Sequence, residues 1–124
     1  MEKKKILLVD DEVGFTNLVR LYLEGTGEFE IRVENDSSKA VESVREFHPD
    51  LILLDVVMPD MDGGEVANKL RSENVFKDIP IVFLTAIAEE AQVTSHGGLI
   101  GGYPFLSKPI DNNKLLVCIR ENLK

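Results

Sequence analysis

Five polar side chains follow short apolar runs of the sequence, and their types suit one chemistry. They are Asp10, Asp11, Asp55, Thr85 and Lys108. Carboxylates that crowd together repel one another, and the arrangement becomes favourable when a hard divalent cation such as Mg²⁺ binds among them. A cation, an ammonium and a hydroxyl around one carboxylate suit phosphoryl transfer, which requires positioning and neutralisation of negative charge. This pattern predicts Asp55 as the nucleophile, forming an acyl phosphate.

The apolar runs that precede these residues predict the strands that position them. Runs 6–9, 51–54 and 79–84 are short, apolar and bounded by turn residues, as expected of strands buried on both faces of a parallel sheet. In 29–33, apolar and charged residues alternate, which predicts a half-exposed edge strand outside the first strand. Segment 103–107 contains Pro104, which lacks an amide donor, so we expect it at the other edge.

Between the strands, apolar residues recur at helical spacing and predict helices. The expected buried stripes are Phe15, Leu18, Val19, Tyr22 and Leu23 in the first helix, Ala40, Val41, Val44 and Phe47 in the second, Val66, Ala67 and Leu70 in the third, and Leu115, Leu116, Ile119 and Leu123 in the last. Residues 36–38, Asp62 with Glu65, and Asp111 are predicted to cap the second, third and last helices. Residues 89–96 predict one more short helix, before a glycine-rich stretch.

About five strands alternating with about five helices predict one α/β domain over residues 1–124, a doubly wound five-stranded parallel sheet with helices on both faces. In such sheets, ligands bind outside the carboxyl ends of the strands near the switch point. All five polar residues fall at such ends. That coincidence is the main functional evidence in the sequence.

Composition narrows the classes of partner and compartment. The chain has 124 residues and a formal net charge of -8, from 22 acidic residues against 14 Lys and Arg, which argues against nucleic acid or an anionic membrane as a direct partner. The single cysteine, Cys118, cannot form an internal disulfide and fits a reducing compartment. The first apolar run is too short for an export signal or a membrane span, so we expect a cytoplasmic protein.

Together, these motifs resemble the receiver domain of two-component response regulators. The residues that carry the resemblance are the pair Asp10-Asp11, Asp55 followed by Met58-Pro59 and Asp62-Gly63, Thr85-Ala86, and Lys108-Pro109. Each motif is weak by itself, but five in the right order at the right strand ends are specific. The resemblance covers essentially the whole chain and implies a flavodoxin-like sheet with strand order 2-1-3-4-5.

The resemblance also implies roles for individual residues. Asp55 would accept a phosphoryl group from a phosphohistidine on a histidine kinase or phosphotransfer protein. Mg²⁺, or another divalent cation, would be held by Asp10, Asp11, Asp55 and the backbone carbonyl of Val57. Thr85 and Lys108 would contact the phosphoryl oxygens. Phe105 would change rotamer when Thr85 moves, and a cis peptide bond before Pro109 would help to aim Lys108.

A chain of this kind is implied to be a phosphoprotein switch in a phosphorelay. It is not expected to be a conventional enzyme, although it would promote its own phosphorylation and dephosphorylation. Its state would pass to a downstream effector or output domain through the last strand and the adjacent helices, a surface that also admits a homodimer.

Two departures from the family pattern lead to further expectations. Tyr103-Pro104 replaces the usual acidic or polar pair before the switch aromatic, and the preceding region is rich in glycine. We therefore expect the unphosphorylated ensemble to sample the active form already. Val57 and Ile87 place apolar bulk beside the expected path of the hydrolytic water, which predicts a long-lived acyl phosphate.

Two other classes of protein are alternatives to this interpretation, an interaction module and an enzyme such as a phosphatase or a flavin or nucleotide binder. A phosphorylation-independent interaction module would keep only the fold, and the intact set of polar residues argues against it. An aspartate-dependent phosphatase would carry a second aspartate two residues after the nucleophile, where this chain has Val57. A flavin or nucleotide binder would need a glycine-rich phosphate loop after the first strand, and the chain has none there.

Overall fold

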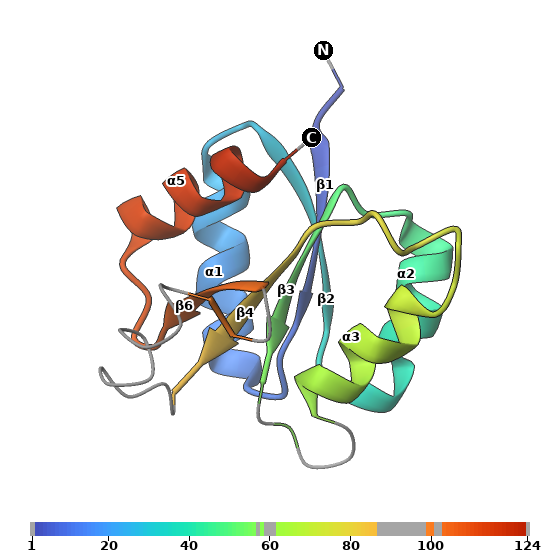
Figure 1. The fold of residues 1–124 in the computed structure, drawn as a ribbon. Coiled ribbons are helices and arrows are strands. Elements are labelled where there is room, and N and C mark those ends of the chain that lie inside the picture. The colour runs from blue at the N-terminus through green and yellow to red at the C-terminus, as the bar shows by residue number, and fades with distance from the viewer. Residues whose placement is uncertain (1, 57, 59–61, 87–98, 101–102, 124) are drawn as a thin grey trace.

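The computed structural model describes residues 2–56, 58, 62–86, 99–100 and 103–123. Five parallel strands form the central sheet, with helices on both of its faces (Figure 1). Their order is β2 (Phe29–Glu34), β1 (Lys4–Val9), β3 (Leu51–Asp55), β4 (Ile81–Thr85) and β6 (Tyr103–Ser107). The predicted fold class and parallel strand order are thereby confirmed.

A sixth, two-residue strand corrects one prediction about the edge of the sheet. β5 (Leu99–Ile100) pairs antiparallel with β6, so segment 103–107 is not the outermost strand. Pro104, which pairs in register with Leu99, lacks an amide donor but keeps its carbonyl. A proline in β6 therefore does not prevent pairing with a neighbouring strand, although this pairing covers only the two residues of β5.

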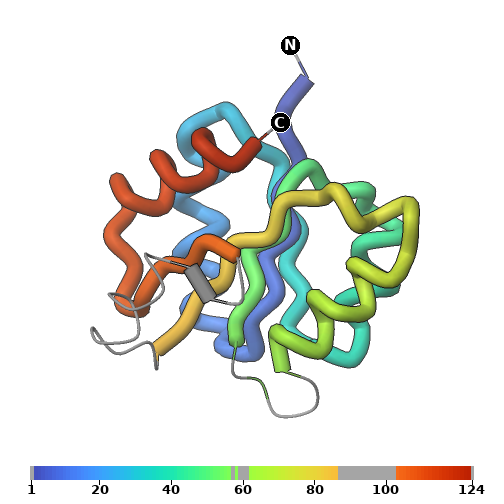
Figure 2. Tube along the Cα trace, in the orientation of Figure 1, coloured from blue at the N-terminus to red at the C-terminus, as the bar shows by residue number. Residues whose placement is uncertain are grey.

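The described helices cover the two faces of the sheet in pairs. α1 (Val13–Gly25) and α5 (Asn112–Asn122) lie on one face, and α2 (Ala40–Phe47) and α3 (Gly63–Arg71) lie on the other (Figure 1). The trace in Figure 2 shows the strands running between these two layers. Among the described residues, no helix is long and apolar enough to cross a membrane.

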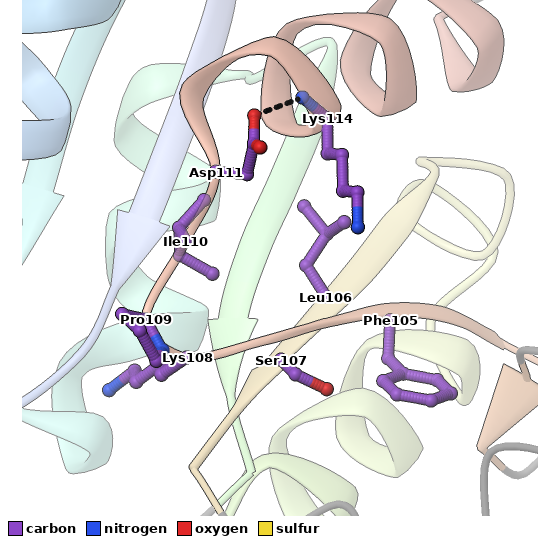
Figure 3. A pocket seen from close by; sticks show the side chains of 8 residues that line it. All are labelled: Phe105, Leu106, Ser107, Lys108, Pro109, Ile110, Asp111 and Lys114. Carbon is purple, nitrogen blue, oxygen red and sulfur yellow. Dashed lines mark hydrogen bonds between the residues drawn. The ribbon is translucent and has the colours of Figure 1, made fainter. Parts of the chain in front are cut away.

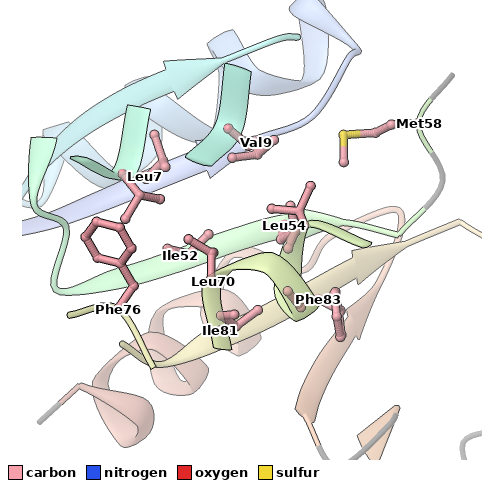
Figure 4. Close-up of a cluster of buried hydrophobic side chains, with 13 residues drawn as sticks. Leu7, Val9, Ile52, Leu54, Met58, Leu70, Phe76, Ile81 and Phe83 are labelled. Carbon is pink, nitrogen blue, oxygen red and sulfur yellow. The ribbon is translucent and has the colours of Figure 1, made fainter. Parts of the chain in front are cut away.

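The unbroken apolar runs of the central strands follow from the two covered faces, because alternate residues of a strand point to opposite sides. Facing α2 and α3 are Leu7, Val9, Ile52, Leu54, Ile81 and Phe83 (Figure 4). Facing α1 and α5 are Ile6, Leu8, Leu51, Leu53, Val82 and Leu84. Both clusters are buried and fix the level of the strands relative to one another.

The prediction that Leu18 of α1 lies in the core is wrong. Leu18 is 71% exposed, whereas Thr16, Val19 and Leu23 face the sheet. Neighbouring residues of a helix are separated by about 100° around its axis, so Leu18 lies at the border of an apolar stripe centred on Val19 and Leu23. Its spacing alone did not show on which side of that border it lies.

Helix caps are located close to where the sequence predicts them. The Asp62 side chain accepts a hydrogen bond from the Glu65 amide at 2.9 Å, and Asp111 accepts from the amides of Asn113 and Lys114 at 2.8 and 3.2 Å. Asp36 instead caps a short 3-10 turn, η1 (Ser37–Lys39), which leads into α2. The predicted caps of α3 and α5 are therefore confirmed.

Replacing Asp111 with alanine is expected to lower the free energy of unfolding by about 1 kcal/mol, because two amides of the first turn lose their acceptor. Asn113→Ala is the matched control, since Asn113 is exposed on the same turn and contributes its backbone amide to the cap. Urea unfolding of both variants measures the difference. Equal stability of the two variants would refute the capping role.

Candidate functional site

The sheet register brings three carboxylates together at the carboxyl ends of β1 and β3. Val9 pairs with Leu54, so Asp10 and Asp55, which follow them, come to the same level of adjacent strands. One carboxylate oxygen from each of Asp10, Asp11 and Asp55 lies within 4.8 Å of the others. Asp10 is fully buried and Asp55 is 4% exposed, while Asp11 is exposed. The cluster thus has a buried base and one side open to solvent.

The backbone around Asp10 is fixed from several directions. Its amide donates to the Glu34 carbonyl at 3.1 Å, and its carbonyl accepts from the Asn35 side-chain amide at 2.8 Å. Its Oδ1 atom accepts from the Glu12 amide at 2.9 Å. The sequence patterns alone do not identify Asn35 as a supporting residue. Its position directly after the edge strand β2, level with the end of β1, was the available signal.

Asp55 is fixed by the start of α3, which approaches the end of β3 closely. The Gly63 amide donates to the Val56 carbonyl at 2.9 Å. A Cβ atom at Gly63 would overlap the Asp55 carbonyl oxygen and lie 3.0 Å from the Val56 Cα. Only glycine therefore allows this helix to begin so close to the predicted acceptor.

Lys108 brings a positive charge to the cluster from the end of β6. Its amide donates to the Thr85 carbonyl at 2.8 Å, and the peptide bond to Pro109 is cis, as the resemblance implied. Its Nζ atom lies 2.7 Å from Asp10 Oδ2 and 3.6 Å from Asp55 Oδ2. The side chain is 10% exposed. The ammonium is thus placed against the buried acids.

Two further groups complete the surroundings of the ammonium. Its Nζ atom donates to Glu12 Oε1 at 2.7 Å and lies 4.4 Å from the centre of the Phe15 ring. The sequence patterns predict no chemistry for Glu12, and they predict Phe15 only as part of the buried stripe of the first helix. An acid directly after the predicted metal pair was the signal that could have identified Glu12.

For both Asp10 and Lys108, burial and the charged neighbours shift the pKa in opposite directions. Burial raises the pKa of Asp10 above its ordinary value, and Lys108 and the Glu12 amide only partly offset that effect. Burial disfavours the charged form of Lys108, but its contacts with Asp10 and Glu12 outweigh burial, and its pKa is raised. Lys108 therefore remains an ammonium at neutral pH.

The other predicted site residues lie where the sheet places them. Thr85 is buried at the end of β4, pairs in register with Ser107, and stands one residue beyond Leu84, the partner of Asp55. Phe105 is half-buried and packs against the cluster that faces α2 and α3. Their roles in phosphoryl binding and switching remain predictions. Val57 and Ile87 lie outside the described residues, as do residues 89–96.

A pocket of about 440 Å³ has Lys108 among its lining residues. It is lined by residues 105–111 and Lys114, and Figure 3 shows Lys108 and Phe105 at opposite ends of it. None of the three carboxylates is among its lining residues. Lys108 thus contacts the acidic cluster with its ammonium and also lines this pocket.

The donor set fits a divalent cation. Asp10 Oδ2 is buried and, although Lys108 is close, it receives no well-directed hydrogen bond within the described part of the chain. A buried carboxylate oxygen with spare acceptor capacity is costly. Three carboxylates that converge on one point, one of them open to solvent, provide the oxygen ligands that hard cations such as Mg²⁺ prefer.

Comparison with known proteins identifies relatives along nearly the whole chain. The profile of the family described as response regulator receiver domain matches residues 6–120. The chain is 35% identical over 127 residues to the response regulator Rre1 of Synechocystis sp., covering 98% of this chain and 52% of that protein. It is 34% identical over 122 residues to the DNA-binding response regulator MtrA of Mycolicibacterium paratuberculosis, covering 98% and 52%. The chain thus spans about half the length of these two relatives.

Solved structures with the same fold include the chemotaxis protein CheY4 of Vibrio cholerae. Its structure has a TM-score of 0.84 and 28% sequence identity, covering 98% of this chain and 100% of that chain. The likeness covers nearly the whole of both chains and shows that they share one fold.

Proposed function

This chain belongs to the response regulator receiver domain family, and on that premise we propose that Asp55 accepts a phosphoryl group from a phosphohistidine. The observation that carries the proposal is the convergence of Asp10, Asp11 and Asp55 within 4.8 Å, with the Lys108 ammonium 3.6 Å from Asp55. This arrangement leaves one carboxylate as nucleophile among groups that neutralise the charge of an incoming phosphoryl group.

Asp10, Asp11 and Asp55 would hold the divalent cation, which would neutralise negative charge on the phosphoryl oxygens. An oxygen of Asp55 attacks phosphorus, the new O–P bond forms, and the P–N bond to the donor imidazole breaks. The imidazole nitrogen keeps the electron pair and takes up a proton. Hydrolysis reverses the modification: water attacks phosphorus, the O–P bond breaks, and the Asp55 carboxylate and inorganic phosphate are released.

The remaining residues assist without changing covalently. Lys108 moves from its resting contacts to a phosphoryl oxygen, and the Thr85 hydroxyl donates to another. The chain accordingly acts as a phosphoacceptor switch that promotes its own phosphorylation and dephosphorylation, and not as an enzyme acting on a separate substrate. Its phosphoryl donor is a histidine kinase or phosphotransfer protein.

The phosphorylated state would be read by an output domain or effector through β6 and the adjacent helices. A relative described as DNA-binding is about twice the length of this chain, so any DNA contact belongs, in our proposal, to a separate output domain. The net charge of -8 supports the assignment of no direct nucleic acid contact to this chain. A cytoplasmic location stays a prediction.

Acetyl phosphate, a small phosphoryl donor, tests the proposal. With Mg²⁺, intact mass spectrometry is expected to detect one added phosphoryl group on the parent protein and none on Asp55→Asn. Without a divalent cation, the modification is expected to fall at least tenfold, because the charge of the transferring group is no longer neutralised. The matched control is Asp50→Asn, a change of the same charge at the opposite end of β3.

Two outcomes would contradict the proposal. No modification of the parent protein in the presence of Mg²⁺ would favour a phosphorylation-independent interaction module. Equal modification of Asp55→Asn and the parent would place the phosphoryl group on another residue.

A further inference from the structure

We propose that Glu12 is a positioning residue that holds the Lys108 ammonium away from Asp55 and so slows phosphorylation. The inference rests on the proposed phosphoacceptor function and assigns a role to a residue outside the three-carboxylate cluster. It predicts that removal of one negative charge at position 12 accelerates the modification of Asp55.

The distances show where the lysine rests. Lys108 Nζ is 2.7 Å from Glu12 Oε1 and 2.7 Å from Asp10 Oδ2, but 3.6 Å from Asp55 Oδ2. The Phe15 ring lies 4.4 Å from the same ammonium, within the range of a cation–π contact. Three groups on or just before α1 therefore draw the ammonium toward this helix and away from the predicted acceptor.

Helix capping does not account for the position of the Glu12 carboxylate. Glu12 occupies the N-cap position of α1, yet its side chain makes no capping hydrogen bond. Its side chain is 61% exposed, whereas that of Lys108 is 10% exposed. An exposed glutamate that turns toward a nearly buried lysine, and not toward the helix amides, is placed to control the lysine.

The contact with Glu12 gains importance once Asp10 is engaged by a divalent cation. The cation would neutralise part of the Asp10 charge and so weaken the attraction between Asp10 and Lys108. Glu12 is not among the clustered ligands, so its attraction for Lys108 would be kept. Glu12 and Phe15 remain as the resting contacts of the ammonium. The phosphoryl group arriving at Asp55 must compete with Glu12 for Lys108.

The test compares rates of modification by acetyl phosphate at saturating Mg²⁺. Glu12→Gln is expected to be phosphorylated about two- to fivefold faster than the parent, the range that loss of one partly exposed ion pair gives. Glu24→Gln, which removes the same charge at the far end of α1, is expected to match the parent. In a Lys108→Met background, Glu12→Gln is expected to have no effect.

Nuclear magnetic resonance supplies a readout that does not depend on turnover. Lys108 methylene protons near the face of Phe15 are expected to show an upfield ring-current shift in the Mg²⁺ form of the parent. In Glu12→Gln with Mg²⁺, that shift is expected to become smaller, because the ammonium spends less time at the ring.

The outcomes separate this inference from the proposed function. A parent protein that is not modified at Asp55 overturns both. If Asp55 is modified, the inference fails when Glu12→Gln gives no acceleration, when the acceleration persists in Lys108→Met, or when the Lys108 shift is unchanged. Lysine-dependent acceleration together with a smaller shift supports it.

Discussion

Replacing Lys108 with methionine is expected to lower the free energy of unfolding at pH 7 by about 3 kcal/mol in the absence of divalent cations. The ammonium is the counterion of the fully buried Asp10 and lies 3.6 Å from Asp55. Removing one partner of a buried ion pair leaves an uncompensated charge, which costs about 3–5 kcal/mol. We expect the lower end because Lys108 is partly exposed.

The pH dependence of this loss follows from the pKa of Asp10. Burial raises that pKa in the folded protein, and without Lys108 it rises further because a contact that lowers it is gone. A folded state that binds the proton more tightly than the unfolded chain becomes more stable as the pH falls through the folded pKa. The loss of stability in Lys108→Met is therefore largest at neutral pH. It becomes smaller as the pH falls toward 3.8, the ordinary pKa of an aspartate side chain.

Urea unfolding at several pH values, with and without Mg²⁺, measures both effects. Mg²⁺ is expected to restore part of the lost stability, since ligand bound only by the folded state stabilises it. Lys77→Met, at an exposed lysine, is the matched control and is expected to change stability by less than about 0.5 kcal/mol. If Lys108→Met is as stable as the control at pH 7, Lys108 is not the counterion of the cluster.

Replacing Gly63 with alanine is expected to destabilise the protein by about 2 kcal/mol and to weaken cation binding at the site. The new Cβ would overlap the Asp55 carbonyl oxygen, so α3 or the end of β3 must move. Overpacking of this kind costs about 1–3 kcal/mol and outweighs the gain in helix propensity. Urea unfolding measures the first effect, and calorimetric titration with Mg²⁺ measures the second.

Gly25→Ala provides the control for this substitution. Gly25 is the last residue of α1, and a Cβ atom there meets nothing within 4 Å. The same change in side chain is therefore expected to leave stability equal or slightly higher. If both variants keep the parent's stability and Mg²⁺ affinity, the close approach of α3 does not position Asp55.

The sheet and its carboxyl-end cluster were predictable because strand order and alternation leave few choices. A polar residue at the end of a buried parallel strand must lie on the side of the sheet where the strands have their carboxyl ends. Asp10, Asp55 and Lys108 could therefore be placed without knowledge of side-chain contacts. The caps at Asp62 and Asp111 were predictable for a similar reason, since capping depends on residues within one turn.

Other features depended on contacts that sequence spacing does not encode. The exposure of Leu18 is decided by which face of α1 packs on the sheet, not by its apolar character. The resting position of Lys108 is set by Glu12, which lies 96 residues away in the sequence. Asn35 supports the Asp10 carbonyl across two strands, and nothing in its local sequence specified that partner.

Reductive trapping locates the phosphoryl group most directly. After treatment with acetyl phosphate and Mg²⁺, borohydride reduces an aspartyl phosphate to homoserine with release of phosphate, and tandem mass spectrometry of the peptides identifies the converted residue. The prediction is conversion at Asp55 alone. Conversion at Asp10 or Asp11, or at no aspartate in a protein that retains its fold, would contradict the assignment of Asp55 as the phosphoacceptor.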